Sequence, residues 1–284
     1  MRKWFALALV VTVLAAVAVA ALRGRNSRGT DAAKEVKASG AVPASNGGVR
    51  APVVVELFTS EGCSSCPPAD ELLAQLNDEQ PVAGAEVIAL AQHVDYWNQL
   101  GWADPFSAHE FSERQGEYVA HFGGEGVYTP QMVVDGGAEF PGGNGGKAFD
   151  AIARAAREPK AEVSLARAGA QADAGDALRL SVRVARLPKL ADGDSADVLL
   201  AVTEGGLSSD VERGENAGRR LTHAGVVRRL TKIGDLSAGA APFAVEPLVT
   251  LEKGWRRENL RAVVFVQEHT SRRVVGAAAF KLFG

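Results

Sequence analysis

The chain has two cysteines, Cys63 and Cys66, which follow an apolar run at 53–58 and are separated by two serines. Pro67 comes next, and proline suits the first turn of a helix because its missing N–H would have no partner there. A thiol pair between a strand and the start of a helix is the arrangement of a thiol–disulfide centre. Since the chain has no other cysteine, a disulfide framework and a four-cysteine zinc site are excluded.

The expected chemistry is exchange between thiols and disulfides. A thiolate is the attacking group, and a helix N-terminus stabilises it. Cys63, nearer the open turn, is expected to attack, and Cys66, inside the first helical turn, is expected to resolve the mixed disulfide. Glu61, Asp70 and Glu71 are acidic neighbours that oppose thiolate formation. We therefore expect a moderately stabilised thiolate, and the direction of electron flow stays open.

Two other roles remain open for the cysteine pair. A permanent bridge would close a very short loop, so it would constrain the unfolded chain little. A metal site would need further ligands, such as His93 and Asp95, and we predict no metal and no cofactor. The functional alternative is a non-catalytic exported protein that binds a ligand or a metal.

The pattern of the chain predicts two domains. For residues 51–159 it predicts strands at 53–58, 86–92, 131–135 and 138–140, and helices at 67–77, 106–121 and 145–157. Strands that alternate with helices imply a right-handed βαβ unit and a mainly parallel sheet. This is the order that an α/β thioredoxin-like domain requires.

Residues 160–284 change to a period-two alternation of apolar and polar residues, as in 178–184. Further runs of this kind lie at 161–167, 197–203, 224–232, 243–251, 260–268 and 273–280. Many short strands separated by turn residues predict an all-β, sandwich-like domain. A polar, basic loop at 216–223 either faces the cysteine site or a partner, or is a solvated connector.

Two strings carry a resemblance to a known superfamily. The run from Glu56 to Asp70, ELFTSEGCSSCPPAD, resembles the active-site turn of glutaredoxins and thioredoxins, although Gly62 stands where thioredoxins have tryptophan. The run YTPQMVVDG around Thr129 and Pro130 resembles the second signature of that superfamily. Over residues 52–282 the chain is similar to an exported family of thioredoxin-like proteins known mainly as a domain of unknown function.

The resemblance implies roles for Thr129, Pro130 and Glu56, and strand position implies one for His93. Thr129–Pro130 should be a cis peptide bond that packs against the cysteines; otherwise Pro130 merely starts an edge strand. Glu56 either accepts a proton from Cys66, as an acidic residue does near this place in thioredoxins, or faces solvent at a sheet edge. His93, at the carboxyl end of a strand, is either a general base or a hydrogen-bonded structural histidine.

The segment at 95–125 is longer than thioredoxins require and rich in aromatic residues. It forms either a lid or groove beside the site, or an extra helix that packs its aromatic side chains inward. Asp95 lies at its start and points the same way as His93 at strand spacing.

The N-terminus predicts export. Residues 1–22 combine a basic start with a long apolar run at 5–22, which fits a signal peptide or an N-terminal membrane anchor. Residues 23–50 have the composition of a disordered linker. A net charge of −3 without a basic stripe argues against nucleic acid as a partner. We expect a periplasmic or secreted protein, with membrane anchoring open, that acts as a thiol–disulfide oxidoreductase on a protein thiol or disulfide partner.

Overall fold

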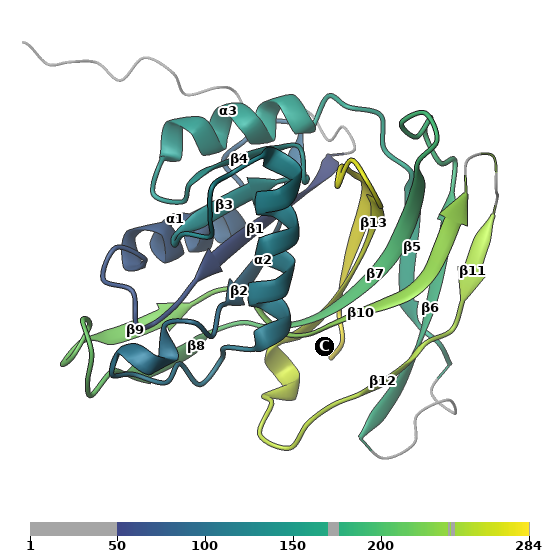
Figure 1. Cartoon of the computed structure of the whole chain (residues 1–284). Coiled ribbons are helices and arrows are strands. Elements are labelled where there is room, and N and C mark those ends of the chain that lie inside the picture. Colours follow the sequence, from purple (N-terminus) through teal and green to yellow (C-terminus); the bar gives the residue numbers. More distant parts are fainter. Residues whose placement is uncertain (1–49, 170–175, 238, 240–241, 284) are drawn as a thin grey trace, which may run out of the picture. The chain divides into compact units, whose positions relative to one another are not determined.

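The computed structural model describes residues 50–169, 176–237, 239 and 242–283 (Figure 1). The predicted signal peptide or anchor at 1–22, and all but the last residue of the linker at 23–50, lie outside these residues. Of the helices that are described, none has the length and apolar character needed to cross a membrane.

The first part of the chain contains the predicted elements in the predicted order. They are β1 (Ala51–Thr59), α1 (Pro67–Glu79), β2 (Ala85–His93), α2 (His109–Phe122), β3 (Gln131–Val134), β4 (Ala138–Pro141) and α3 (Gly145–Ala155), with a short 3₁₀ helix, η1 (Asn98–Leu100), before α2. Strand β1 is buried from Val53 to its end. Such a continuous apolar run suits a strand with helices on both faces and a neighbour on each side.

The largest sheet is mixed, with the strand order β14-β13-β7-β10-β2-β1-β3-β4. Strands β1 and β2 pair in parallel across the β1–α1–β2 unit, and β2 also pairs in parallel with β10. The other neighbouring pairs of described strands are antiparallel. The prediction of a mainly parallel sheet was therefore wrong. Within the described residues a single crossover helix, α1, joins neighbouring parallel strands, and most other strands return as antiparallel neighbours.

Alternate residues of β1 face different layers of the fold. Val53 and Leu57 belong to a core shared with α1 and α3, whereas Val54 and Phe58 point to the opposite face, which α2 covers. Figure 1 shows α2 lying across this sheet. Glu56 has the same parity as Val54 and Phe58, so strand geometry directs it away from α1. This parity decides which polar side chains of β1 can approach the cysteines.

Four of the ten described strands after the first part extend its sheet. The elements are β5 (Glu162–Arg167), β6 (Ala177–Ala185), β7 (Ser195–Glu204), β8 (Leu207–Asp210), β9 (Arg220–His223), β10 (Val226–Ser237), β11 (Phe243–Val245), β12 (Leu248–Thr250), η3 (Arg257–Asn259), β13 (Leu260–Glu268) and β14 (Val274–Lys281). Strands β7, β10, β13 and β14 lie in the large sheet, and the described residues belong to one compact unit. The predicted boundary between 51–159 and 160–284 therefore does not divide the sheet.

A smaller sheet covers the C-terminal strands. Strands β5, β6, β11 and β12 form it, and β8 and β9 make a separate hairpin. Leu180 and Val182 of β6 share one hydrophobic core with Val198 of β7 and Val264 of β13. The alternation at 178–184 arises because every second side chain of β6 enters this core. The pattern predicts such one-sided burial, but it does not show that the opposing sheet also carries β1 and β2.

Candidate active site

The cysteine pair occupies the turn between β1 and α1, where the two residues form a disulfide with Cα atoms 5.4 Å apart. Cys66 is the N-cap residue of α1, and Pro67 opens the helix as expected. Hydrogen bonds from the Cys63 N–H to the Ser60 carbonyl (3.1 Å) and from the Cys66 N–H to the Cys63 carbonyl (3.2 Å) fix the turn. The positive end of the helix dipole therefore lies at the sulfur pair.

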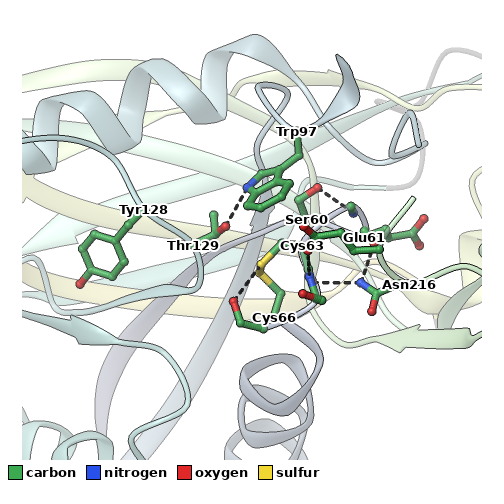
Figure 2. Close-up of a disulfide and its surroundings, with 12 residues drawn as sticks. Ser60, Glu61, Cys63, Cys66, Trp97, Tyr128, Thr129 and Asn216 are labelled. Atoms are coloured by element: carbon green, nitrogen blue, oxygen red, sulfur yellow. Dashed lines mark hydrogen bonds between the residues drawn. A yellow bond between two sulfur atoms is a disulfide. The ribbon is translucent and has the colours of Figure 1, made fainter. Parts of the chain in front are cut away.

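Both cysteines are fully buried, although the two serines between them are exposed. Cys63 was predicted to lie near an open turn, but its side chain is covered. Figure 2 shows the disulfide with Thr129 on one side and Asn216 on the other, and with Trp97 beside it. A thiol partner cannot reach Cys63 in this arrangement unless a covering residue moves.

The Thr129–Pro130 peptide bond is cis, which confirms the prediction. The Thr129 hydroxyl accepts a hydrogen bond from the indole N–H of Trp97 (2.8 Å), and the Pro130 carbonyl accepts one from the N–H of Gly142 (2.9 Å). A Cβ atom on Gly142 would lie 3.1 Å from the side chains of both Pro130 and Ala69. The proline segment is therefore packed closely against α1, beside the disulfide.

His93 is fully buried and is paired with Asp104, whose Oδ2 lies 2.7 Å from its Nδ1. Asp104 also accepts a hydrogen bond from the backbone N–H of Glu61 (2.8 Å), which links the pair to the cysteine turn. Burial opposes the charge of Asp104, but His93 and these hydrogen bonds hold the pKa of the carboxyl below its usual value. Of the two roles left open for His93, the structure shows a hydrogen-bonded histidine.

Asp95 does not join His93. Its carboxylate accepts a hydrogen bond from the Ser112 hydroxyl and lies 3.0 Å from Nδ1 of His109 on α2, and these contacts, that of Ser112 first, lower its pKa. The cysteine pair, His93 and Asp95 are therefore not arranged as a metal site. Nowhere in the described part of the chain do three or more His, Cys, Asp or Glu residues form a group that could hold a metal ion.

A second buried pair lies beside the first. Glu61 Oε1 is 3.0 Å from Nε2 of His223, and Glu61 Oε2 accepts a hydrogen bond from the indole N–H of Trp102 (2.8 Å). The rings of His93 and His223 are 4.7 Å apart between centroids, and Phe106 packs against both. His223 ends β9, so the C-terminal part of the chain builds one wall of the site.

Asp70 is a buried carboxyl group on α1, one helical turn after Cys66. Residues four apart share a helix face, and the Asp70 N–H donates to the Cys66 carbonyl (3.1 Å). Burial raises the pKa of Asp70 to about 7, although His223 and Thr59 act in the opposite direction. Its Oδ1 has no hydrogen-bond partner among the described residues. The sequence analysis treated Asp70 only as an acidic neighbour of the cysteines. Its spacing of four residues from Cys66 could have indicated that the two share one face of α1.

Glu56 faces neither Cys66 nor solvent, so both predicted roles were wrong. It is 1% exposed and lies on the α2 side of β1, where the Arg114 guanidinium donates to both of its oxygens (2.9 and 3.1 Å). Tyr118 and Gln92 donate to the same carboxylate. Although burial opposes its charge, Arg114 has a raised pKa because of Glu56. This pair ties α2 to the sheet.

The aromatic segment at 95–125 contributes in two ways. Phe111 and Tyr118 on α2 are buried against the sheet, as predicted for an extra packed helix. Trp97 and Trp102, which precede α2, instead donate hydrogen bonds at the edge of the cysteine site. The part before the helix therefore lines the site.

The segment 211–219, between β8 and β9, contacts the cysteine turn directly. The side-chain amide of Asn216 donates hydrogen bonds to the carbonyls of Glu61 (2.8 Å) and Cys63 (3.0 Å). Of the alternatives left open for the loop at 216–223, the structure shows the one that faces the cysteines. The hairpin itself was missed, because its short strands are largely polar.

Comparison with known proteins identifies the family of this chain. Residues 54–267 match the model of a family described as "Protein of unknown function (DUF1223)", and the chain belongs to that family. The chain is similar to a crystal structure of an Agrobacterium tumefaciens protein from a structural genomics programme, at 28% identity and a TM-score of 0.58. The match covers 83% of this chain and 95% of the other. A search of curated proteins found no match.

Proposed function

We propose that this member of the DUF1223 family is an extracytoplasmic thiol–disulfide oxidoreductase on a thioredoxin-like scaffold, and that it uses Cys63 and Cys66. The observation that carries the proposal is the disulfide at the N-terminus of α1, with buried titratable side chains around it. A disulfide that closes so short a loop would stabilise the fold little, because it restricts the unfolded chain little. Such a bridge would also have no need of carboxyl and imidazole groups beside it.

The exchange proceeds in two displacement steps. A partner thiolate attacks Sγ of Cys63, forms a new S–S bond and breaks the Cys63–Cys66 bond, whose electron pair goes to Cys66 as a thiolate. A second partner thiolate then attacks the partner sulfur of the mixed disulfide and releases Cys63 as a thiolate. Two electrons thus pass from a partner dithiol to the chain, and the reverse sequence oxidises a partner.

Asp70 supplies the proton that the Cys66 thiolate needs. When the Cys63–Cys66 disulfide is reduced, the neutral carboxyl group of Asp70 gives its proton to the Cys66 thiolate. When the disulfide forms again, the Asp70 carboxylate takes the proton from the Cys66 thiol. Burial keeps the pKa of Asp70 at about 7, in the range where both transfers are efficient. Asp70 takes the role that Glu56 was predicted to fill.

The proposed partner is a protein thiol or disulfide outside the cytoplasm. The basic start and apolar run at 1–22 support export, either with a cleaved signal peptide or with an anchor at 5–22. Extracytoplasmic compartments favour disulfide formation, so exported proteins there offer substrates for exchange.

A Cys66→Ser variant tests the proposal. Without the resolving thiol, Cys63 should remain bound to its partner, giving species on non-reducing gels that disappear with reductant. The Cys63→Ser, Cys66→Ser double variant is the matched control and should give none. Failure to trap any species, together with no reduction of insulin disulfides and no oxidation of a model dithiol by the wild type, would contradict the proposal.

The full burial of both cysteines favours one other function, a non-catalytic binding protein with a permanent bridge. The reduction potential of the Cys63–Cys66 pair separates the two. A potential between about −270 and −120 mV fits exchange, whereas a value below about −300 mV fits a structural bridge.

A further inference from the structure

We propose that the segment 211–219 is a cap that closes over Cys63 and has to open before the disulfide can react with a thiol. The inference rests on the proposed exchange at Cys63, and it identifies the residues that decide which thiols reach this sulfur. Asn216 is the anchor of the cap. Glu215 is its second attachment.

Asn216 is the one buried residue between 212 and 220. It is 1% exposed, and its amide nitrogen donates to the carbonyls of Glu61 and Cys63 on the cysteine turn. Its own Oδ1 accepts a hydrogen bond from Arg219 (2.8 Å), so the amide is held in this orientation. A single buried amide in an otherwise exposed segment therefore joins the cap to the turn.

The second attachment is charged and exposed. The backbone N–H of Ser64 donates to the Glu215 carboxylate at 3.0 Å, and this contact lowers the pKa of Glu215. Val211 is buried where the cap joins β8, but the rest of the cap, residues 212–219, buries no apolar side chain. Closure of the cap therefore depends on a few hydrogen bonds rather than on hydrophobic packing, which is the condition for local opening at low cost.

The other walls of the site are held more firmly. Trp97 is bonded to Thr129 on one side of the disulfide, and Figure 2 places Asn216 on the other. At the base of the hairpin, the buried Glu61–His223 pair fixes the end of β9. The segment 211–219 is thus the part of the enclosure that can move while the strands beside it remain in place.

Displacement at a disulfide requires the attacking sulfur to approach along the S–S axis. Because Cys63 is fully buried, the rate of its reaction with a thiol equals the fraction of open molecules multiplied by the rate of the open form. Variants that weaken the anchor raise that fraction. They should therefore accelerate reduction without changing the cysteines.

The experiment uses the full oxidised chain and dithiothreitol as the probe. The reaction is stopped with iodoacetamide, and mass spectrometry counts the alkylated cysteines over time. Asn216→Ala removes both hydrogen bonds to the cysteine turn, together with the one from Arg219, and should accelerate reduction by about tenfold or more. Glu215→Gln keeps the shape of the exposed side chain but removes its charge, and it should accelerate reduction a few-fold.

Arg220→Gln is the matched control, because Arg220 pairs with the exposed Asp210 in the same hairpin, away from the cysteine turn. It should leave both the rate and the urea unfolding midpoint unchanged, and every variant should unfold in one cooperative transition. Equal rates in wild type, Asn216→Ala and Glu215→Gln would overturn the cap. If Asn216→Ala does not fold, the rate of Glu215→Gln tests the cap: faster reduction than in the wild type supports it, and an equal rate contradicts it. Because dithiothreitol needs no biological partner, the cap can stand even where no partner is trapped through Cys63.

Discussion

At the scale of single residues, two carboxyl groups near the disulfide differ because of their surroundings. Asp104 is ionised against His93 and accepts a backbone hydrogen bond, so its pKa lies below the usual value. Asp70 is buried, and its pKa rises to about 7. Pairs of acids with separated pKa values commonly divide the work of a site. Here Asp104 pairs with His93, and the proposed exchange assigns the proton to Asp70.

Asp70→Asn should stabilise the protein at neutral and higher pH. Between about pH 4 and pH 7 the unfolded chain has lost this proton while the folded chain keeps it, so the free energy of unfolding falls as pH rises. Above pH 7 the full cost of the buried charge is present. We expect the variant to exceed the wild type by about 2–4 kcal/mol at pH 8, with the difference shrinking towards pH 4. Urea unfolding at the two pH values measures it.

Asp78→Asn, on the exposed side of α1, is the control and should change the free energy of unfolding by less than about 0.5 kcal/mol at either pH. The Asp70→Asn variant should also slow the reduction of the Cys63–Cys66 disulfide by dithiothreitol. A variant that is less stable than the wild type at pH 8 would contradict the assignment of a buried, costly carboxylate.

The residues that the sequence could identify were those with local signals. The spacing of Cys63 and Cys66, and the resemblance around Pro130, predicted a disulfide turn and a cis bond, and both are present. The predicted role of Glu56 as a proton acceptor for Cys66 was wrong, because neighbouring residues of a strand face opposite sides of the sheet. Arg114, which binds Glu56, lies 58 residues later in the sequence, on α2, and no local sequence pattern predicts such a pair.

At the scale of elements, the turn between β9 and β10 fixes the C-terminal part of the chain to β2. The Gly225 carbonyl accepts a hydrogen bond from the Ala91 N–H (2.9 Å). Gly225 has a φ of +61°, and a Cβ atom there would lie 2.6 Å from the Ala89 carbonyl oxygen. The same turn places His223 at the site, so its geometry serves the fold and the site together.

Gly225→Ala should therefore destabilise the protein more than an ordinary substitution at positive φ. Gly193→Ala is the matched control, because Gly193 has a φ of +79° but no atom within 4 Å of an added Cβ. The control should cost about 1–2 kcal/mol for left-handed backbone alone, and Gly225→Ala should cost at least about 1 kcal/mol more from the close contact. Thermal or urea unfolding measures both, and equal losses would show that β2 does not hold this turn.

Periodicity predicted most of the strands and helices and missed the polar hairpin of β8 and β9. Strands β1, β2 and β13 and helix α1 have continuous or alternating apolar patterns, and their ends lie close to the predicted ones. Strands β8 and β9 carry almost no such pattern, yet the segment between them donates a hydrogen bond to the Cys63 carbonyl. The hairpin is largely polar, and most of its residues are exposed or half-buried.

At the scale of the whole described molecule, the two predicted domains share one sheet. Strand β2 lies between β1 and β10, and Val54 of β1, Phe111 of α2 and Phe265 of β13 belong to one core. Arg114 on α2 also donates a hydrogen bond to Gln267 on β13. Sequence patterns describe each element by itself, so they suggested two consecutive domains where long-range pairing makes one sheet.

A fragment of residues 51–159 should therefore not fold cooperatively by itself. Without β10 it exposes the edge of β2, and without β7 and β13 it exposes the apolar face formed by Val54, Ile88 and Leu90. We expect a broad thermal transition and weak near-UV circular dichroism, against a sharp transition for the full chain. Adding the separate fragment 160–284 should restore a cooperative transition. A sharp transition in 51–159 alone would show that the first part folds independently and that the shared sheet is a later docking of two domains.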